Sequence, residues 1–352
     1  THADATASAL IISTTLPSIS NSSLKSSTNS DSWAKKGEDV ILTFTTTKAI
    51  KVPKIIFKSG SLILGIVLGT NSGTNSGNKL DWEARYSVTD ASTDGRVDYE
   101  IIYEDLAGNS GPQSTQNGSL DIDTQLPVVT VGTLKGPDNT NWVRDSQSIK
   151  LEFTSNDTLA DTPTVAFRSG LSYNNSVSLS GTVVYDPSGG ATAGTTYTAT
   201  YDISGHRDTT NGFVFYEISN INDPAGNQGV PKIGSSQLQL NTTKPSVTNI
   251  ISYEALGPHK TRVREGGQII LKFTTSEPIQ SGGPVVNFQI GNQNPSPASV
   301  YSLLDAATNC WQVNYTVPTL SEGPVTDRSI SYQISSITDL AGNTTTGVGW
   351  TS

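Results

Sequence analysis

The chain has 352 residues, enough for two or three domains that each bury a hydrophobic core. Its formal net charge is −9 and only 15% of its residues are charged, so it presents no basic face and we expect no nucleic-acid partner. A single cysteine excludes an intramolecular disulfide framework and a multi-cysteine metal site.

The composition favours many short strands joined by turns, because the chain has 32 Gly and 17 Pro with abundant Ser, Thr and Asn. It contains no Met, even at position 1. We therefore expect a secreted, extracellular protein whose signal segment has been removed. The first residues, Thr1–Ala9, are small and polar. The sequence leaves open whether they form a disordered tail.

The first clear strand pattern lies in Leu10–Pro17, and it recurs in Leu120–Pro127 and Leu238–Pro245. Each copy has apolar residues at its first and third positions, a threonine at its fifth, and a proline at its end. This is the alternation of a strand, closed by a residue that cannot donate to a ladder. The second and third copies each close a repeat, whereas almost no chain precedes the first.

Three repeats follow residues 1–16, and we place them at 17–126, 127–244 and 245–352. The spacing from Pro17 to Pro127 is 110 residues, and from Pro127 to Pro245 it is 118. Within each repeat, short alternating strands succeed one another, which predicts an all-β fold of three antiparallel two-sheet sandwiches. Alternation in nearly every strand argues against a parallel sheet covered by helices.

Each repeat also carries an Asp-x-Ala-Gly-Asn turn, at Asp105–Asn109, Asp223–Asn227 and Asp339–Asn343. Together with the threonine- and proline-containing linkers, this turn resembles the tandem immunoglobulin-like repeats of bacterial surface proteins and adhesins. The resemblance implies immunoglobulin-like sandwiches and a role as a stalk, spacer or fibre, since such repeats serve all three.

The third repeat is predicted to lack its last strand. The distance from Asn109 to Leu120 and from Asn227 to Leu238 is eleven residues, but eleven residues beyond Asn343 is position 354, past Ser352. A sandwich without that strand exposes a hydrophobic groove and unpaired strand edges. The copy of the strand at the N-terminus would fill such a groove in another molecule, by strand addition.

We therefore expect a protomer of an extracellular, pilus-like fibre whose partners are other copies of itself. Because donor and acceptor lie at opposite ends of the chain, the contact propagates instead of closing a dimer. This resembles the donor-strand exchange of bacterial pilus subunits. The predicted donor strand consists of Leu10, Ile11, Ile12, Ser13, Thr14, Thr15 and Leu16. Of these, Leu10, Ile12 and Thr14 are expected to face the core, with Leu16 at the end of the strand. The predicted acceptor groove consists of Ile269, Leu271, Phe273, Tyr332, Ile334 and Ile337.

Two other arrangements fit the same pattern. The chain could be the spacer of a longer covalent adhesin, in which a preceding domain uses Leu10–Leu16 and later residues complete the third repeat. It could also be a monomer that folds its N-terminus back, although about fifteen extended residues span at most roughly 50 Å.

Residues with catalytic chemistry are sparse, because the three histidines lie apart in polar sequence. We expect no enzyme activity and no cofactor. Turn formation alone explains the aspartates of the repeated turns. A calcium ion at the first domain joint is the weaker alternative, with Asp105, Asp121 and Asp123 as its candidate ligands.

The longest apolar run, Leu62–Leu68, is far shorter than the roughly twenty residues that a membrane helix needs, so we expect no membrane span. As a strand it would have two apolar faces, which indicates either a lateral contact between subunits or a locally thicker core. The candidate contact residues are Leu62, Ile63, Leu64, Ile66, Val67 and Leu68.

Overall fold

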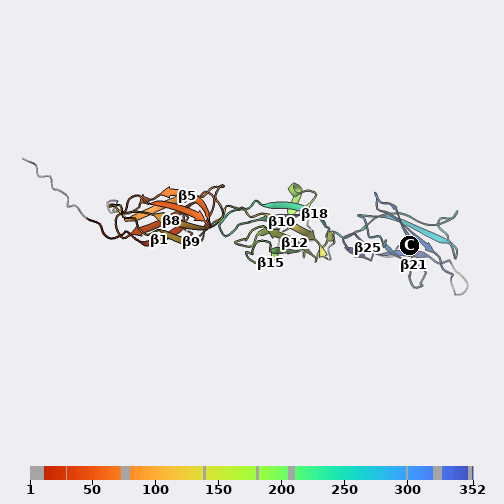
Figure 1. The fold of residues 1–352 in the computed structure, drawn as a ribbon. Coiled ribbons are helices and arrows are strands. Elements are labelled where there is room, and N and C mark those ends of the chain that lie inside the picture. Colours follow the sequence, from red (N-terminus) through yellow and green to blue (C-terminus); the bar gives the residue numbers. More distant parts are fainter. Residues whose placement is uncertain are drawn as a thin grey trace, which may run out of the picture.

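A computed structural model gives the fold of the chain, and it describes residues 12–28, 30–72, 80–137, 140–179, 182–204, 211–298, 300–319, 327–347 and 351. Three β-sandwiches follow one another in a row (Figure 1). Their strands form six sheets, and the described residues include no α-helix. The predicted all-β fold of several immunoglobulin-like sandwiches is thus confirmed.

Domain 1 packs a four-stranded sheet, in the order β1-β3-β7-β6, against a five-stranded sheet, in the order β2-β9-β8-β4-β5. Its core includes Phe57 and Trp82. The strands are β1 (Ile19–Ser26), β2 (Trp33–Ala34), β3 (Asp39–Thr46), β4 (Lys54–Ser59), β5 (Leu62–Leu68), β6 (Thr70–Asn71), β7 (Asp81–Ser87), β8 (Gly95–Ile102) and β9 (Ser114–Ile122).

Domain 2 repeats this arrangement with the sheets β10-β12-β16-β15 and β11-β18-β17-β13-β14. Its core includes Phe153 and Phe167. The elements are β10 (Val129–Lys135), β11 (Trp142–Val143), β12 (Ser148–Ser155), β13 (Thr164–Gly170), the 3-10 turn η2 (Tyr173–Asn175), β14 (Ser176–Ser178), β15 (Val183–Asp186), β16 (Thr196–Asp202), β17 (Gly212–Ser219) and β18 (Lys232–Leu240).

Domain 3 has two four-stranded sheets, β19-β20-β24-β23 and β22-β21-β25-β26. Its core includes Phe273 and Phe288. The strands are β19 (Val247–Ala255), β20 (Gln268–Thr275), β21 (Val285–Ile290), β22 (Ser296–Pro297), β23 (Val300–Asp305), β24 (Cys310–Thr316), β25 (Ile330–Thr338) and β26 (Thr344–Thr346).

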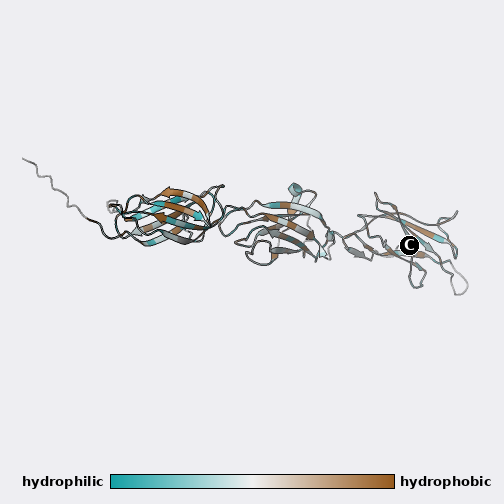
Figure 2. Ribbon diagram, in the orientation of Figure 1, coloured by the Kyte–Doolittle hydropathy of each residue, from teal (hydrophilic) through white to brown (hydrophobic). Residues whose placement is uncertain are grey.

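The alternation seen in the sequence becomes the alternation between core and surface. In β3, for example, Val40 and Leu42 are fully buried and Phe44 is nearly so, while Ile41 and Thr43 between them are not buried. Successive side chains of a strand point to opposite faces, so each sandwich buries one face of each of its sheets. The brown segments of Figure 2 follow the strands in all three domains.

No helix in the described part of the chain has the length and apolar character needed to cross a membrane.

Candidate functional site

The last strand is the element that distinguishes the three domains. In domain 1, β9 is nine residues long and pairs with two strands, antiparallel with β8 and parallel with β2. In domain 2, β18 has the same length and pairs with β17 and β11 in the same way. The second half of each strand closes the core, because Leu120, Ile122, Leu238 and Leu240 are at most 1% exposed.

In domain 3 only the first half of that strand is found among the described residues. It is seen in a bridge in which Thr351 exchanges two backbone hydrogen bonds with Tyr332, and it is preceded by β26, which is three residues long and pairs with β25. The third repeat therefore has the start of its last strand, which the sequence analysis did not foresee. The segment Arg262–Val263, which matches β2 and β11, is not a strand. This follows from the fold, because β2 and β11 pair only with the second half of β9 and β18.

A groove of about 760 Å³ lies where the second half of the strand runs in the other domains. Its walls include Val263 and Ile330, which are only partly buried. The matching residues of domains 1 and 2 are fully buried at 0% exposure: Ala34, Val97, Val143 and Val214. Ile290 and Val317 also line the groove.

Tyr253 closes part of this groove from β19. It stands where β1 and β10 carry Leu24 and Leu134, as shown by its pairing opposite Leu271. Its hydroxyl donates a 2.8 Å hydrogen bond to the carbonyl oxygen of Ile330, on the strand that borders the groove. Burial raises the pKa of the Tyr253 hydroxyl to about 12, so it remains a donor at neutral pH.

The predicted acceptor residues are all buried in domain 3, but the structure brings only one of them to the groove. Ile269 lines it. The other five lie deeper in the core and are at most 5% exposed: Leu271, Phe273, Tyr332, Ile334 and Ile337. Sequence reasoning missed Val263 and Ile330. The signal that could have found them was their alignment with Ala34 and Val97, beside the missing strand.

Of the predicted donor strand, Leu10 and Ile11 lie outside the described residues. Ile12 is 84% exposed and Leu16 is 60% exposed. Leu126, which matches Leu16, is 52% exposed although its strand is in place. In domain 1, the core-facing part of the pattern therefore ends before Leu126. The matching expectation, that Leu16 at the end of the donor strand faces the core, is not supported by this comparison.

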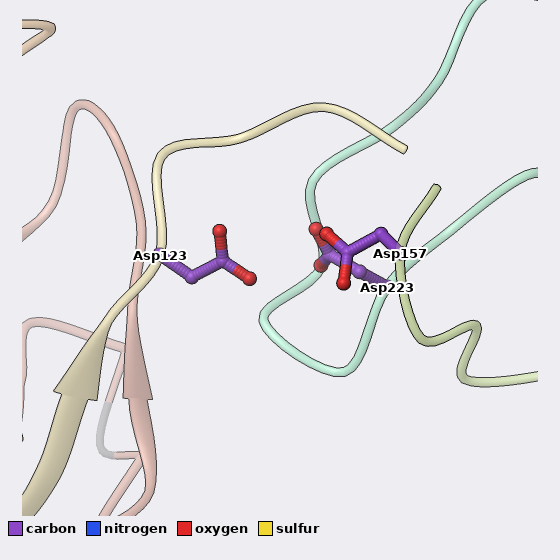
Figure 3. Close-up of side chains that lie close together, drawn as sticks. All are labelled: Asp123, Asp157 and Asp223. Carbon is purple, nitrogen blue, oxygen red and sulfur yellow. The ribbon is translucent and has the colours of Figure 1, made fainter. Parts of the chain in front are cut away.

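Where one domain meets the next, three side chains come together in the same way each time. We call such a meeting point a joint. In the joint between domains 1 and 2, Asp123 follows β9 and points across to Asp157 and Asp223 of domain 2 (Figure 3). Their carboxylate oxygens lie within 4.8 Å of one another. Burial, helped by the charges of Asp223, Asp157 and Asp94, raises the pKa of Asp123 to about 6.

The same three positions come together on the N-terminal side of domain 1, with other side chains, and we call this arrangement a joint as well. Ser13, Lys48 and Asp105 occupy the positions of Asp123, Asp157 and Asp223. Lys48 Nζ lies 2.6 Å from Ser13 Oγ and 3.0 Å from Asp105 Oδ2, and Ser13 Oγ donates to Asp105 Oδ2 at 2.9 Å. Hydrogen bonds from Asn109 and Lys48 hold the pKa of Asp105 well below its usual range.

The joint between domains 2 and 3 has Asn241, Glu277 and Asp339 at these positions. The amide nitrogen of Asn241 donates to Glu277 Oε2 at 2.6 Å and to Asp339 Oδ2 at 3.0 Å. Burial raises the pKa of Glu277. An ammonium and an amide thus stand between oxygens in two joints, whereas three carboxylates meet in the third.

The asparagine of the repeated turn makes the same contact in all three joints. The amide nitrogens of Asn109, Asn227 and Asn343 donate to the backbone carbonyls of Ser13, Asp123 and Asn241, at 3.2, 3.0 and 2.9 Å. The turn therefore holds the end of the preceding strand, a role beyond the turn formation inferred from sequence.

The structure does not bring the candidate calcium ligands together. Asp105 contacts Ser13 on the N-terminal side of domain 1, and Asp121 forms a 2.8 Å ion pair with Arg96. Asp123 meets Asp157 and Asp223 instead. Strand β9 leads away from the Asp105 turn to the next domain, which separates residues that are close in sequence. Calcium takes about six to eight oxygen ligands, so the three carboxylates fit it only as part of a larger set.

The apolar run in β5 divides between surface and core. Leu62, Ile63, Ile66 and Leu68 are at least half exposed, while Leu64 and Val67 pack against the core of domain 1. Strand β5 is at the edge of its sheet, and it is brown in Figure 2.

No protein-family model matches the sequence, and no curated protein matches it. Among solved structures, bovine butyrophilin is similar over 58% of this chain and 93% of its own, at 15% identity and a TM-score of 0.24.

Proposed function

We propose that the protein is a structural subunit of an extracellular, pilus-like fibre in which the segment around Leu10–Leu16 of one copy completes domain 3 of another. The observation that carries the proposal is the open groove beside Val263 and Ile330. Its counterparts in domains 1 and 2 are filled by segments with the same pattern as Leu10–Leu16.

The paired strands indicate how the donor would lie. Asp121 stands opposite Arg96 and beside Trp33, and Ile122 stands opposite Gly95 and beside Ala34. By the same register, Ile11 would stand opposite Ser329 and Ile12 opposite Arg328. Leu10 and Ile12 would then enter the groove, as Leu120 and Ile122 do.

Backbone hydrogen bonds would fix this register on the other side as well. In domain 1, Asp121 N donates to Ser32 O and Asp123 N donates to Ala34 O, at 2.8 and 3.0 Å. Domain 2 repeats both bonds from Gln239 and Asn241. In domain 3, the acceptors at these places are the carbonyls of Thr261 and Val263, two residues that line the groove.

The test compares Ile12→Asp with Ile11→Asp. Ile12→Asp would place an unpaired charge in the groove and should abolish fibres, because an isolated buried charge is very costly. Ile11 matches Asp121 and Gln239, which are not buried, so Ile11→Asp should assemble nearly as well as the unchanged protein. Assembly is measured by sedimentation and electron microscopy.

Fibres from Ile12→Asp, or equal loss from both variants, would contradict the proposal. Failure of the unchanged protein to assemble at any concentration would favour the alternative, in which the strand that completes domain 3 belongs to the same, longer polypeptide.

A further inference from the structure

We infer that the contact between two copies reproduces the joints inside one copy residue for residue, with Asp327 of the acceptor receiving Thr14 of the donor and Arg264 of the acceptor lying on the Gly108 turn of the donor's domain 1. This inference rests on the function proposed above, and it assigns two contacts that strand insertion alone does not require.

The threonine contact occurs in both internal joints. In domain 1, Asp94 Oδ1 accepts from both the backbone nitrogen and the hydroxyl of Thr124, each at 2.8 Å. In domain 2, Asn211 Oδ1 accepts from the same two groups of Thr242, at 3.0 and 3.3 Å. Each acceptor lies just before the strand that pairs with the last strand, β8 or β17, and binds the threonine four residues after the buried leucine.

Domain 3 has the matching acceptor, Asp327, and no threonine among the described residues of this domain contacts it. Asp327 lies five residues before Tyr332, as Asp94 and Asn211 lie five residues before Tyr99 and Tyr216. Its side chain is 90% exposed and forms an ion pair with Arg262, itself 76% exposed, at 2.9 Å. The N-terminal segment supplies Thr14, which is exposed, at the matching place four residues after Leu10.

The second contact joins a basic side chain to the glycine of the next domain's turn. Lys35 Nζ donates to Gly226 O at 2.6 Å. At the following joint, a Cβ placed on Gly342 would lie 3.3 Å from Arg144 Nε.

Arg264 has the same place in domain 3, on the wall of the groove, and Gly108 has the same place in the turn of domain 1. All three glycines have positive φ, of 82°, 88° and 96° for Gly226, Gly342 and Gly108, so the turns have one shape.

Both sides of the proposed contact between two copies are thus present in the single subunit. Ser13 is already held on domain 1 by Asn109 and Lys48, as Asp123 is held on domain 2 by Asn227. Once Leu10 and Ile12 enter the groove, the donor strand is fixed at both ends. Domain 1 of one copy should then sit on domain 3 of the next as domain 2 sits on domain 1.

The experiment is a double-mutant cycle across the contact. The measured quantity is the subunit concentration that remains in solution beside fibres, for the unchanged protein, Thr14→Ala, Asp327→Ala and the double variant. Asp327→Ala should raise this concentration by about tenfold, since it removes two hydrogen bonds to a charged acceptor. Thr14→Ala should raise it by about threefold, since only the hydroxyl is lost. In the Asp327→Ala background, Thr14→Ala should have no further effect.

Two sets of controls separate this contact from other causes. Arg262→Ala removes the ion pair of Asp327, so it measures how far loss of that pair alone raises the concentration; exposed ion pairs contribute little. Arg264→Lys should assemble normally, because Lys35 makes the equivalent contact, whereas Arg264→Glu should assemble poorly. Lys232→Glu, at an exposed site of β18, controls for the change in net charge.

Additive effects of Thr14→Ala and Asp327→Ala, or equal assembly of Arg264→Glu and Lys232→Glu, would overturn the inference. If fibres form and Ile12→Asp still abolishes them, the proposed function survives that outcome. If the unchanged protein forms no fibres, both fall.

Discussion

Domains 2 and 3 have the same strand order apart from β11, which has no counterpart in domain 3, yet domain 2 is closed and domain 3 is open. In domain 2, β18 reaches Leu240 and leaves Val143 and Val214 at 0% exposure. In domain 3, the matching Val263 and Ile330 remain partly exposed beside a groove. The deeper core is nevertheless complete, since Phe273 and Phe288 are at 0% exposure. A sandwich of this kind keeps its core without the second half of its last strand, which the proposed strand exchange between molecules requires.

The largest effect should come from closing domain 3 within one chain. Residues Ala9–Pro17, copied after Ser352 through a short flexible linker, would have a millimolar effective concentration at the groove. Burial of two apolar side chains should stabilise domain 3 by about 3–6 kcal/mol, measured by denaturant unfolding, and fibres should disappear. The same extension with aspartate at the position copied from Ile12 is the control. Fibres at the normal rate from the closed protein would show that another segment is the donor.

The next effect contrasts a strand held within the chain with a borrowed one. Leu240→Ala should destabilise domain 2 by about 2–5 kcal/mol, because it opens a cavity in a closed core. Ile12→Ala should leave the unfolding free energy of the unassembled subunit unchanged, since Ile12 is exposed there. It should instead raise the concentration needed for assembly. A loss of stability in the unassembled Ile12→Ala subunit would show that Ile12 already packs against its own chain.

A smaller effect on stability should come from the three carboxylates that meet in the joint between domains 1 and 2. The pKa of Asp123 in the folded protein is about 6, above its ordinary value of 3.8. As pH rises from about 4 to 6, the unfolded state loses this proton first, so Asp123 makes folding progressively less favourable and the loss persists above pH 6. Asp123→Asn should remove that loss. The difference in melting temperature between the two proteins should grow from pH 4 to 6 and then level off, whereas a difference independent of pH would contradict this.

The smallest effect on stability should come from the hydrogen bond beside the groove of domain 3. Tyr253→Phe removes the hydroxyl that caps the carbonyl of Ile330 and should destabilise domain 3 by about 0.5–1.5 kcal/mol. Leu134→Ala in domain 2 changes the matching position of a closed domain and should cost more, about 2–5 kcal/mol, because Leu134 is buried. A larger loss of unfolding free energy from Tyr253→Phe than from Leu134→Ala would mean that the Tyr253 hydroxyl is a main source of stability in domain 3.

Much of the fold could be predicted because it depends on period-two alternation. The buried faces of the last strands follow from it directly, as Leu120, Ile122, Leu238 and Leu240 show. The groove was harder to predict, because Val263 lies in a segment that forms no strand without a partner. The joints were hardest, since Lys48, Asp157 and Glu277 share a position but differ in residue type, and Lys48 also in the sign of its charge. A contact whose residue type changes at every repeat leaves no motif in a single sequence.

The direction of the last strand has a mechanical consequence. Strand β9 leads from domain 1 into the joint with domain 2, and the domains follow one another in a row (Figure 1). A pull along that row would draw the strand lengthwise against its two neighbours, β8 and β2. Its ladder hydrogen bonds would then be loaded in shear and share the force, instead of opening one at a time. We expect a borrowed strand clamped in this way to resist tension nearly as well as a covalent one, so a fibre held together without covalent bonds could still bear load.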